Sequence, residues 1–225
     1  MYDLFLLALV LGGAVWLWSA ISRSGDRRGR PRRRKRITEA ERDSLRSAVG
    51  REGEERVSAL VRSMGLPILD DVYLDNGRGE TVQIDHLVDL GNRIAVLETK
   101  NWAAGDGGLN GRVDDGQWVR DGKPFSNPIR QNAYHVTALK RVIGGTHVLP
   151  LVVFAGDAEP PLGTGEFAVH IDDLPARLTV GQRHPAVEHV WRRLEEIDRH
   201  TDKVAIGAAH VARIKSDRAG RRRWH

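Results

Sequence analysis

The sequence predicts an α/β domain, with a small mixed β-sheet flanked by helices, preceded by one N-terminal transmembrane helix. Residues 82–100 carry apolar and polar side chains on both sides of a Gly91-Asn92 pair, the pattern of a β-hairpin. Residues 148–156 form a short continuous apolar run, typical of a strand buried on both faces. Helical segments come before and between these strands, an order that favours a mixed sheet covered by helices.

The transmembrane helix is predicted from Leu4–Ile21, eighteen residues without a charge. As a helix they extend about 27 Å, close to the roughly 30 Å of hydrocarbon in a bilayer. A signal peptide would carry positive charges before the apolar run, but the early charge is Asp3, and Trp18 lies where cleavage after Ala20 needs a small side chain. A core helix would show polar residues at helical spacing, and residues 4–21 show no such pattern. We therefore expect residues 1–21 to form a membrane anchor.

Basic residues are concentrated in two segments. Residues 22–36 hold nine Lys/Arg and one Asp, and residues 213–225 hold six Lys/Arg and one Asp. These segments contribute +8 and +5 to a chain whose net charge is +5, so the remainder carries −8. An acidic domain argues against a protein that binds long nucleic acid with its whole surface.

The first basic segment directly follows the apolar helix and therefore predicts its orientation. The positive-inside rule places this segment, and the folded domain after it, in the cytoplasm. Residues 23–36 would also attract anionic lipid, at about 1 kcal/mol per residue near the membrane surface. Contact with nucleic acid is the alternative for the same residues. The chain has no cysteine, which excludes disulfides, thiolate nucleophiles and cysteine zinc sites and fits a reducing compartment.

Four parts are expected along the chain: a membrane anchor at 1–21, a basic juxtamembrane linker at 22–37, the α/β domain at 38–178, and a helical C-terminal extension with a basic tail at 179–225. After the first helix, the expected elements are a strand at 66–74, a turn at 75–80, the hairpin, an exposed excursion with a short hairpin at 108–123, a helix from Asn127-Pro128 to about Ile143, a strand at 148–156, a short strand near 166–171, a helix from Asp172 or Asp173, and a helical tail from about Pro185 to Lys215.

The first helix of the domain is predicted to begin at Thr38, because Thr38 followed by Glu41 is a capping-box pattern. It ends near Met64, where Gly65 supplies a C-terminal stop. Gly50 is a possible break within it.

One acidic residue of this helix, Glu54, lies at the edge of the apolar stripe. The stripe consists of Val57, Leu60, Val61 and Met64. At about 100° per residue, Glu54 lies only some 20° around the helix from Val61. Glu54 is therefore predicted to border the domain core.

The hairpin places two acidic residues opposite each other. With a two-residue Gly91-Asn92 turn, residues pair when their numbers sum to 183, so Asp85 faces Glu98. Directly opposed Cβ atoms on one face of a sheet are about 5 Å apart, and two like charges placed so are unfavourable. A divalent cation between them would compensate.

The same register places Gln83 opposite Lys100 on that face. Mg²⁺ typically takes one or two carboxylates, with waters and substrate phosphate as its other ligands. Lys100, two residues from Glu98, would then lie near enough to stabilise charge on a phosphate. The alternative is that both acids lie in solvent at strand ends and that Lys100 pairs with one of them.

The chain contains four linked motifs, GREGEERV at 50–57, VQIDHLV at 82–88, LETKNW at 97–102 and NPIRQN at 127–132. In their order and approximate spacing they resemble the nuclease-related domain (NERD), a branch of the PD-(D/E)XK nuclease superfamily, and the resemblance covers about residues 48–175. The Pro-Asp of the superfamily is Ile84-Asp85 in this chain, as it generally is in NERD sequences.

This resemblance implies a restriction-endonuclease-like core that binds Mg²⁺ or Mn²⁺ for phosphodiester hydrolysis. It also implies five site residues: Asp85 and Glu98 as metal-binding carboxylates, Lys100 as the catalytic lysine, Glu54 as an acid from the first helix, and Gln131 as a polar residue directed at the site from the next helix.

Other polar and aromatic residues near the motifs have less specific roles. Strand alternation turns His86 away from Asp85, so a packed or hydrogen-bonded histidine is expected there. Asn101, Trp102 and Asn127 are candidates to shape the mouth of the site, and core packing is the alternative to base stacking for Trp102.

Three classes of function follow from these observations. The first is a membrane-anchored, Mg²⁺-dependent nuclease that hydrolyses phosphodiester bonds in DNA at the cytoplasmic face of the membrane. The second is a non-catalytic nucleic-acid-binding protein that retains the nuclease fold. The third is a membrane scaffold whose basic ends bind lipid or an acidic partner. Opposed carboxylates beside a lysine favour the first, because a binding protein has no use for them.

Overall fold

The computed structural model of the chain describes residues 38–105, 108–144, 147–209 and 211–212. The predicted anchor at 1–21, the linker at 22–37 and the basic tail from 213 onward lie outside these residues. Among the helices that are described, none combines the length and the apolar character needed to cross a bilayer.

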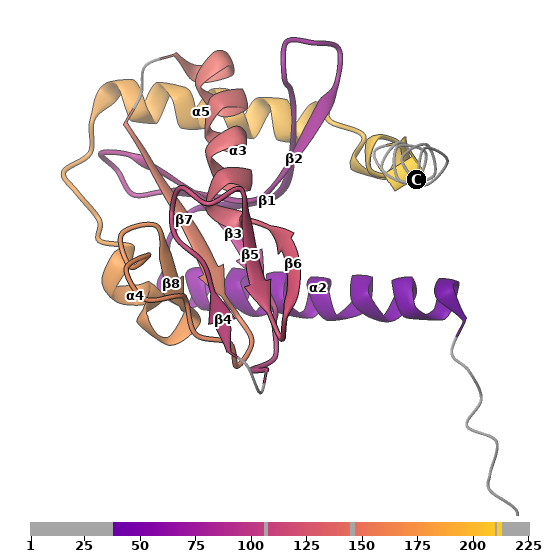
Figure 1. The fold of residues 1–225 in the computed structure, drawn as a ribbon. Helices are drawn as coiled ribbons and strands as arrows, with labels where there is room; N and C mark the ends of the chain where they lie inside the picture. The colour runs from indigo at the N-terminus through magenta and orange to yellow at the C-terminus, as the bar shows by residue number, and fades with distance from the viewer. Residues whose placement is uncertain (1–37, 106–107, 145–146, 210, 213–225) are drawn as a thin grey trace, which may run out of the picture. The chain divides into compact units, whose positions relative to one another are not determined.

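The central element is a five-stranded mixed sheet (Figure 1). Its strands follow the order β1-β2-β3-β7-β8. β2 is antiparallel to both β1 and β3, whereas β3, β7 and β8 are mutually parallel. The strands are β1 (Ile68–Asp75), β2 (Thr81–Asp89), β3 (Ile94–Lys100), β7 (Val148–Phe154) and β8 (Ala168–His170). The predicted mixed sheet is confirmed.

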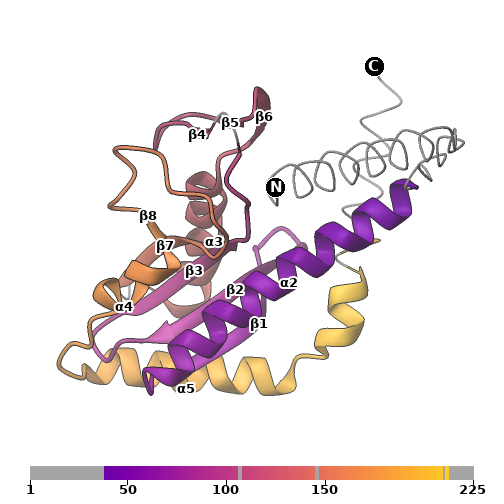
Figure 2. The same cartoon turned by 90° about the horizontal axis from the view of Figure 1, so that it is seen from below.

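Helices cover both faces of the sheet, as predicted. On one face, α3 (Pro128–Ile143) and α5 (Pro185–His200) bury Leu139 and Trp191 against side chains such as Val96 of β3. On the other, α2 (Glu39–Ser63) buries Val57 against Leu97 and shares its core with the short helix α4 (Leu174–Arg177) (Figure 2). Neighbouring strand residues point to opposite faces, so β3 contributes to both cores.

The capping box of α2 forms as expected. The Thr38 N–H donates to the Glu41 carboxylate over 2.7 Å, and the Glu41 N–H donates to the Thr38 hydroxyl over 3.2 Å. Gly65 after the helix has φ +72°, a conformation that suits glycine. The helix continues unbroken through Gly50.

The excursion at 108–123 is mostly exposed and contains a short hairpin, as predicted, but it also buries Trp118. It belongs to a second, antiparallel sheet formed by β4 (Leu109–Asn110), β5 (Gln117–Arg120) and β6 (Lys123–Ser126). Trp118 is fully buried and stacks on Phe154 of the main sheet, with 6.4 Å between ring centroids. Gly111 makes room for this ring, since a Cβ there would lie 2.1 Å from it. Trp118 thus anchors the small sheet on the domain.

Two helices after the sheet differ in length from the prediction. The helix expected from Asp172 or Asp173 consists of a 3₁₀ turn, η1 (Ile171–Asp173), and the one-turn α4. The C-terminal helix begins at Pro185 as predicted but ends at His200, and a separate helical turn follows at 203–209.

Asn127 caps α3 and also binds the loop before β5. Its Oδ1 accepts from the Ile129 N–H over 2.9 Å, and its Nδ2 donates to carbonyl oxygens of residues 112, 113 and 115. Because Asn127→Ala removes a cap and the donor to these partly buried carbonyl oxygens, we expect it to lower the free energy of unfolding by about 2–3 kcal/mol, measured by urea denaturation. The exposed Asn110→Ala is the control, and an equal effect of both would contradict this role.

Candidate functional site

The predicted register of the β2–β3 hairpin is confirmed, but its ladder stops short of the acids. Gly91 has φ +79° in the turn, and the pairs run from Asp89 opposite Ile94 to His86 opposite Leu97, each summing to 183. The expected next pair, Asp85 opposite Glu98, is not part of the ladder, and neither is the Gln83–Lys100 pair. The two strands separate where the acidic side chains begin.

The β1–β2 ladder is also interrupted at this level. Its register would pair Asp71 with Asp85, but that pair is missing between the Asp70–His86 and Val72–Ile84 pairs. Asp71 has φ +52°, an unusual conformation for an aspartate. We call this interruption the 71/85 kink.

The kink changes which residues face the core. Val72 and Ile84 on one side of it, and Leu69 and Leu87 on the other, all belong to the core beneath α3 and α5. Strict alternation across an unbroken strand would turn the second pair to the opposite face. The strands therefore restart their alternation at the kink.

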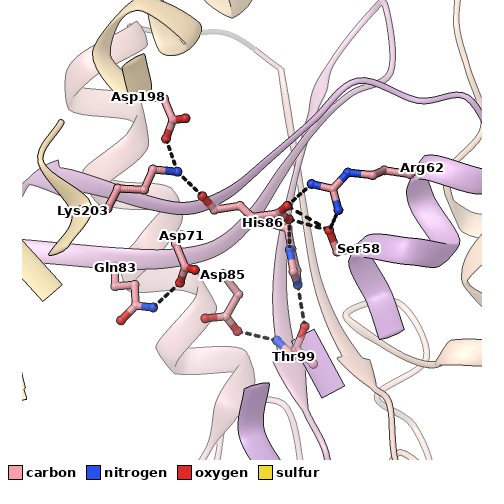
Figure 3. Close-up of polar contacts among 10 residues, drawn as sticks. Ser58, Arg62, Asp71, Gln83, Asp85, His86, Thr99, Asp198 and Lys203 are labelled. Atoms are coloured by element: carbon pink, nitrogen blue, oxygen red, sulfur yellow. Dashed lines mark hydrogen bonds and ion pairs between the residues drawn. The ribbon is translucent and has the colours of Figure 1, made fainter. Parts of the chain in front are cut away.

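Asp85 leaves both ladders and is directed to the neighbouring strand β3. Its Oδ2 accepts from the Thr99 N–H over 2.7 Å, as Figure 3 shows. Across the kink, Asp71 is held by Gln83, whose Nε2 donates to Oδ1 over 2.7 Å. The half-buried Asp85 carboxylate thus lies beside the strand that carries Glu98 and Lys100.

Glu98 and Lys100 form an ion pair beneath α3, in which Glu98 is buried and Lys100 is half-buried. The Lys100 ammonium contacts Oε1 of Glu98 and also donates to Oε1 of Gln131 over 3.3 Å. Glu98 is 1% exposed. These contacts bring three of the predicted site residues together, and Gln131 lies in the first turn of α3 as expected.

The sequence did not single out His135, which also contacts Glu98. Its Nδ1 lies 3.1 Å from Oε2 of Glu98, and both side chains are buried. His135 follows Gln131 by four residues, so both lie on one face of α3. That spacing is the signal from which His135 could have been found.

The charges of the site shift each other's pKa in opposite directions. Burial, and then the Glu98 carboxylate, raise the pKa of Asp85 to about 7. Burial alone would also raise the pKa of Glu98, but Lys100 and His135 outweigh it and lower that pKa below its ordinary value. Burial would lower the pKa of Lys100, but the carboxylates of Glu98 and Asp85 raise it. Near pH 7, Glu98 is thus held charged, whereas Asp85 is about half protonated.

Glu54 borders the same site from α2, as the helical wheel predicted. Burial, then the Asp71 carboxylate, and to a smaller extent Glu98 raise its pKa, whereas His86 and Lys100 partly offset this rise. Gly53 brings this part of α2 close to β3, because a Cβ there would lie 2.5 Å from Cβ of Asn101. Asn101 also donates from Nδ2 to the carbonyl oxygen of residue 49 over 2.7 Å.

A pocket of about 290 Å³ opens between α2 and the 71/85 kink. Its lining includes five acidic residues, among them Glu54, Asp71 and Asp85, and two arginines, Arg51 and Arg62. The Asp85 carboxylate is therefore reachable from solvent on the α2 side of the sheet.

The remaining candidates have structural contacts. His86 is buried and hydrogen-bonded, as predicted, with its nitrogen atoms near Asp70 and Thr99. Trp102 packs edge-on against Phe125 and Phe154, with centroid distances of 4.6 and 5.6 Å, which favours core packing over base stacking. Asn101 donates to a carbonyl oxygen of α2, and Asn127 caps α3, as described above.

Asp85 and Glu98 carry the carboxylate oxygens that a hard divalent cation such as Mg²⁺ prefers. No group of three or more His, Cys, Asp or Glu residues suited to a metal is found within the described part of the chain. Mg²⁺ needs no such group, since waters and substrate phosphates complete its octahedron. In the described residues, Oε2 of Glu98 is buried without a well-aligned hydrogen bond, and Nδ1 of His135 lies 3.1 Å away from it.

Comparison with known proteins points to one family. The sequence profile of the nuclease-related domain (NERD) matches residues 49–155, which include all five predicted site residues. An uncharacterized protein of Bacillus anthracis is 30% identical over 101 residues, which cover 42% of this chain and 46% of that protein. This chain therefore aligns with about half the length of that curated relative, and no solved structure matches this chain. Residues 49–155 are thus similar to the NERD family of nuclease-related domains.

Proposed function

We propose that this protein is a membrane-anchored nuclease that uses Mg²⁺ or Mn²⁺ to hydrolyse phosphodiester bonds in DNA at the cytoplasmic face of the membrane. The observation that carries the proposal is the Lys100 ammonium between Glu98 and Gln131, on the strand whose Thr99 N–H donates to the Asp85 carboxylate. A nuclease-related family and an acidic site with one positioned cation support the chemistry together.

Each residue has a role in this proposal. Asp85 and Glu98 would hold the cation, which when bound supplies Lewis-acid activation of the phosphate. Lys100, oriented by Gln131, would donate to the phosphate oxygen on which charge develops. Glu54, whose pKa is raised, would accept a proton from water at the open side of the pocket.

The membrane location rests on the sequence of residues 4–21 and on the basic residues 23–36, which would bind anionic lipid after the anchor. In this arrangement, the basic segments offer phosphate contacts that the acidic domain lacks. DNA near the membrane would then be the accessible substrate.

Cleavage assays on the full-length chain in a non-ionic detergent test this function. We expect cutting of plasmid or linear DNA with Mg²⁺ or Mn²⁺ and none with EDTA. Lys100→Met should lower the rate roughly 10²–10³-fold, because it removes the donor to the developing charge. Lys140→Met is the matched control, since Lys140 is an exposed lysine of α3.

Cutting that persists in EDTA, or that Lys100→Met leaves unchanged, would contradict the proposed mechanism. Salt-sensitive binding of DNA or RNA without any cleavage would instead favour the non-catalytic nucleic-acid-binding function.

A further inference from the structure

A lysine after the C-terminal helix contacts the strand that carries the 71/85 kink. The Lys203 ammonium donates to the carbonyl oxygen of Asp70 over 2.6 Å and pairs with Oδ1 of Asp198 over 2.7 Å. The following turn also lies along β1, since a Cβ at Gly207 would be 2.9 Å from the Tyr73 hydroxyl. All the C-terminal residues in these contacts lie beyond the matched segment 49–155.

Asp70 connects this C-terminal segment to α2 and β2. Its carboxylate accepts from the Ser58 hydroxyl over 2.9 and 3.0 Å, pairs with Arg62, and lies 2.7 Å from Nδ1 of His86. Burial alone would raise the pKa of Asp70, but His86, Ser58 and Arg62 lower it to about 2. Asp70 is therefore a charged and fixed group at the start of the kink.

From Asp70 the contacts continue to the proposed metal ligand. Nε2 of His86 lies 3.2 Å from the Thr99 hydroxyl, and the Thr99 N–H donates to the Asp85 carboxylate over 2.7 Å. Figure 3 shows His86 and Asp85 meeting the same threonine from two sides. One continuous line of contacts thus joins Lys203 to Asp85.

The kink needs such support. A non-glycine residue at φ +52° is strained, and that conformation persists only where its surroundings fix it. Gln83 fixes the Asp71 side chain, and Lys203 fixes the carbonyl group immediately before it. Without Lys203, β1 and β2 would be able to restore the missing 71/85 pair, and Asp85 would turn back into the ladder.

We propose that Lys203 and Asp70 are positioning residues that hold the 71/85 kink and thereby aim the Asp85 carboxylate at β3. The C-terminal extension then contributes to the geometry of the site through Lys203. This inference rests on the proposed function in that it takes Asp85 to be a metal ligand.

Amide hydrogen exchange and metal binding on the full-length chain test the inference. In Lys203→Ala, we expect the Thr99 amide to exchange about tenfold faster, while the amide of Val153, its partner on β7, is unchanged. Calorimetry should show Mn²⁺ binding weakened by at least about fivefold. Lys203→Arg should restore both values, because it can still donate to the Asp70 carbonyl.

Lys140→Ala, an exposed lysine on another helix, is the matched control and should change neither value. Unchanged exchange at Thr99 in Lys203→Ala would overturn the inference. Equal acceleration at Thr99 and Val153 would do so too, since it shows only a general loss of stability. If the wild type binds no metal but Thr99 responds as expected, the positioning role stands and the proposed function fails.

Discussion

Asp85→Asn should stabilise the metal-free protein, by roughly 2–4 kcal/mol at pH 8. Burial and the Glu98 carboxylate raise the pKa of Asp85 to about 7, so the folded state at pH 8 holds a charge that it disfavours. A shift of about three units corresponds to about 4 kcal/mol, which partial exposure reduces. Asparagine keeps an oxygen for the Thr99 N–H. Chemical denaturation in EDTA measures the effect.

The stability gained by Asp85→Asn should increase as the pH rises. Because the folded-state pKa of Asp85 lies above its unfolded value, the stability contributed by the protonated acid is complete below about pH 4 and is lost as the pH rises through about 7. Asp85→Asn should therefore show its full advantage at pH 8 and almost none near pH 4.

Mg²⁺ should reverse the order of stability of the wild type and Asp85→Asn. Mg²⁺ is expected to raise the melting temperature of the wild type and to leave that of Asp85→Asn unchanged, because the variant lacks a ligand. The exposed Asp114→Asn is the control and should respond to Mg²⁺ as the wild type does. If Asp85→Asn were less stable than the wild type at both pH values, Asp85 would not have the environment assigned to it. If Mg²⁺ stabilised Asp85→Asn as much as the wild type, Asp85 would not be a metal ligand.

Glu98→Gln should have the opposite effect on stability, a loss of about 3 kcal/mol at pH 7. Burial disfavours the Glu98 charge, but Lys100 and His135 favour it more and lower its pKa. Removal of this carboxylate leaves the half-buried Lys100 ammonium without its closest partner. Urea denaturation of the wild type and the variant measures the difference.

The loss should fade as the pH falls. A group whose folded-state pKa is lowered contributes stability above its unfolded pKa, and that contribution disappears as the pH falls through the folded value. The two proteins should therefore converge only at a pH below the folded-state pKa of Glu98, which lies below its ordinary value. Glu166→Gln, on an exposed loop, is the control. If Glu98→Gln were as stable as the wild type at neutral pH, the ion pair with Lys100 would contribute nothing to the fold.

Local chemistry predicted the fold and the hairpin well. The Gly91-Asn92 turn fixed the register of β2 and β3, and the Asn127-Pro128 pair marked the start of α3. These features depend on residues close together in sequence. The family motifs then supplied the five predicted site residues, all of which the structure places around the separated ends of β2 and β3 or on the helices facing them.

Features that depend on distant residues were not predictable in this way. The 71/85 kink depends on the pairing of β1 with β2 and on their register. Its trace in the sequence is that Ile84 and Leu87, three residues apart, are both apolar, a spacing that strict strand alternation would place on opposite faces. His135 reaches Glu98 only through the packing of α3, and Trp118 is buried only because a separate sheet folds over β7. Sequence spacing carries no direct record of these contacts.

The contact between Lys203 and β1 has a consequence for relatives of this domain. A homologue whose chain stops before this lysine must tolerate the left-handed residue at position 71 by other means. Glycine is the simplest substitute, because it adopts positive φ without a steric penalty. Among such homologues, loss of the tail and gain of a glycine at this position should therefore go together.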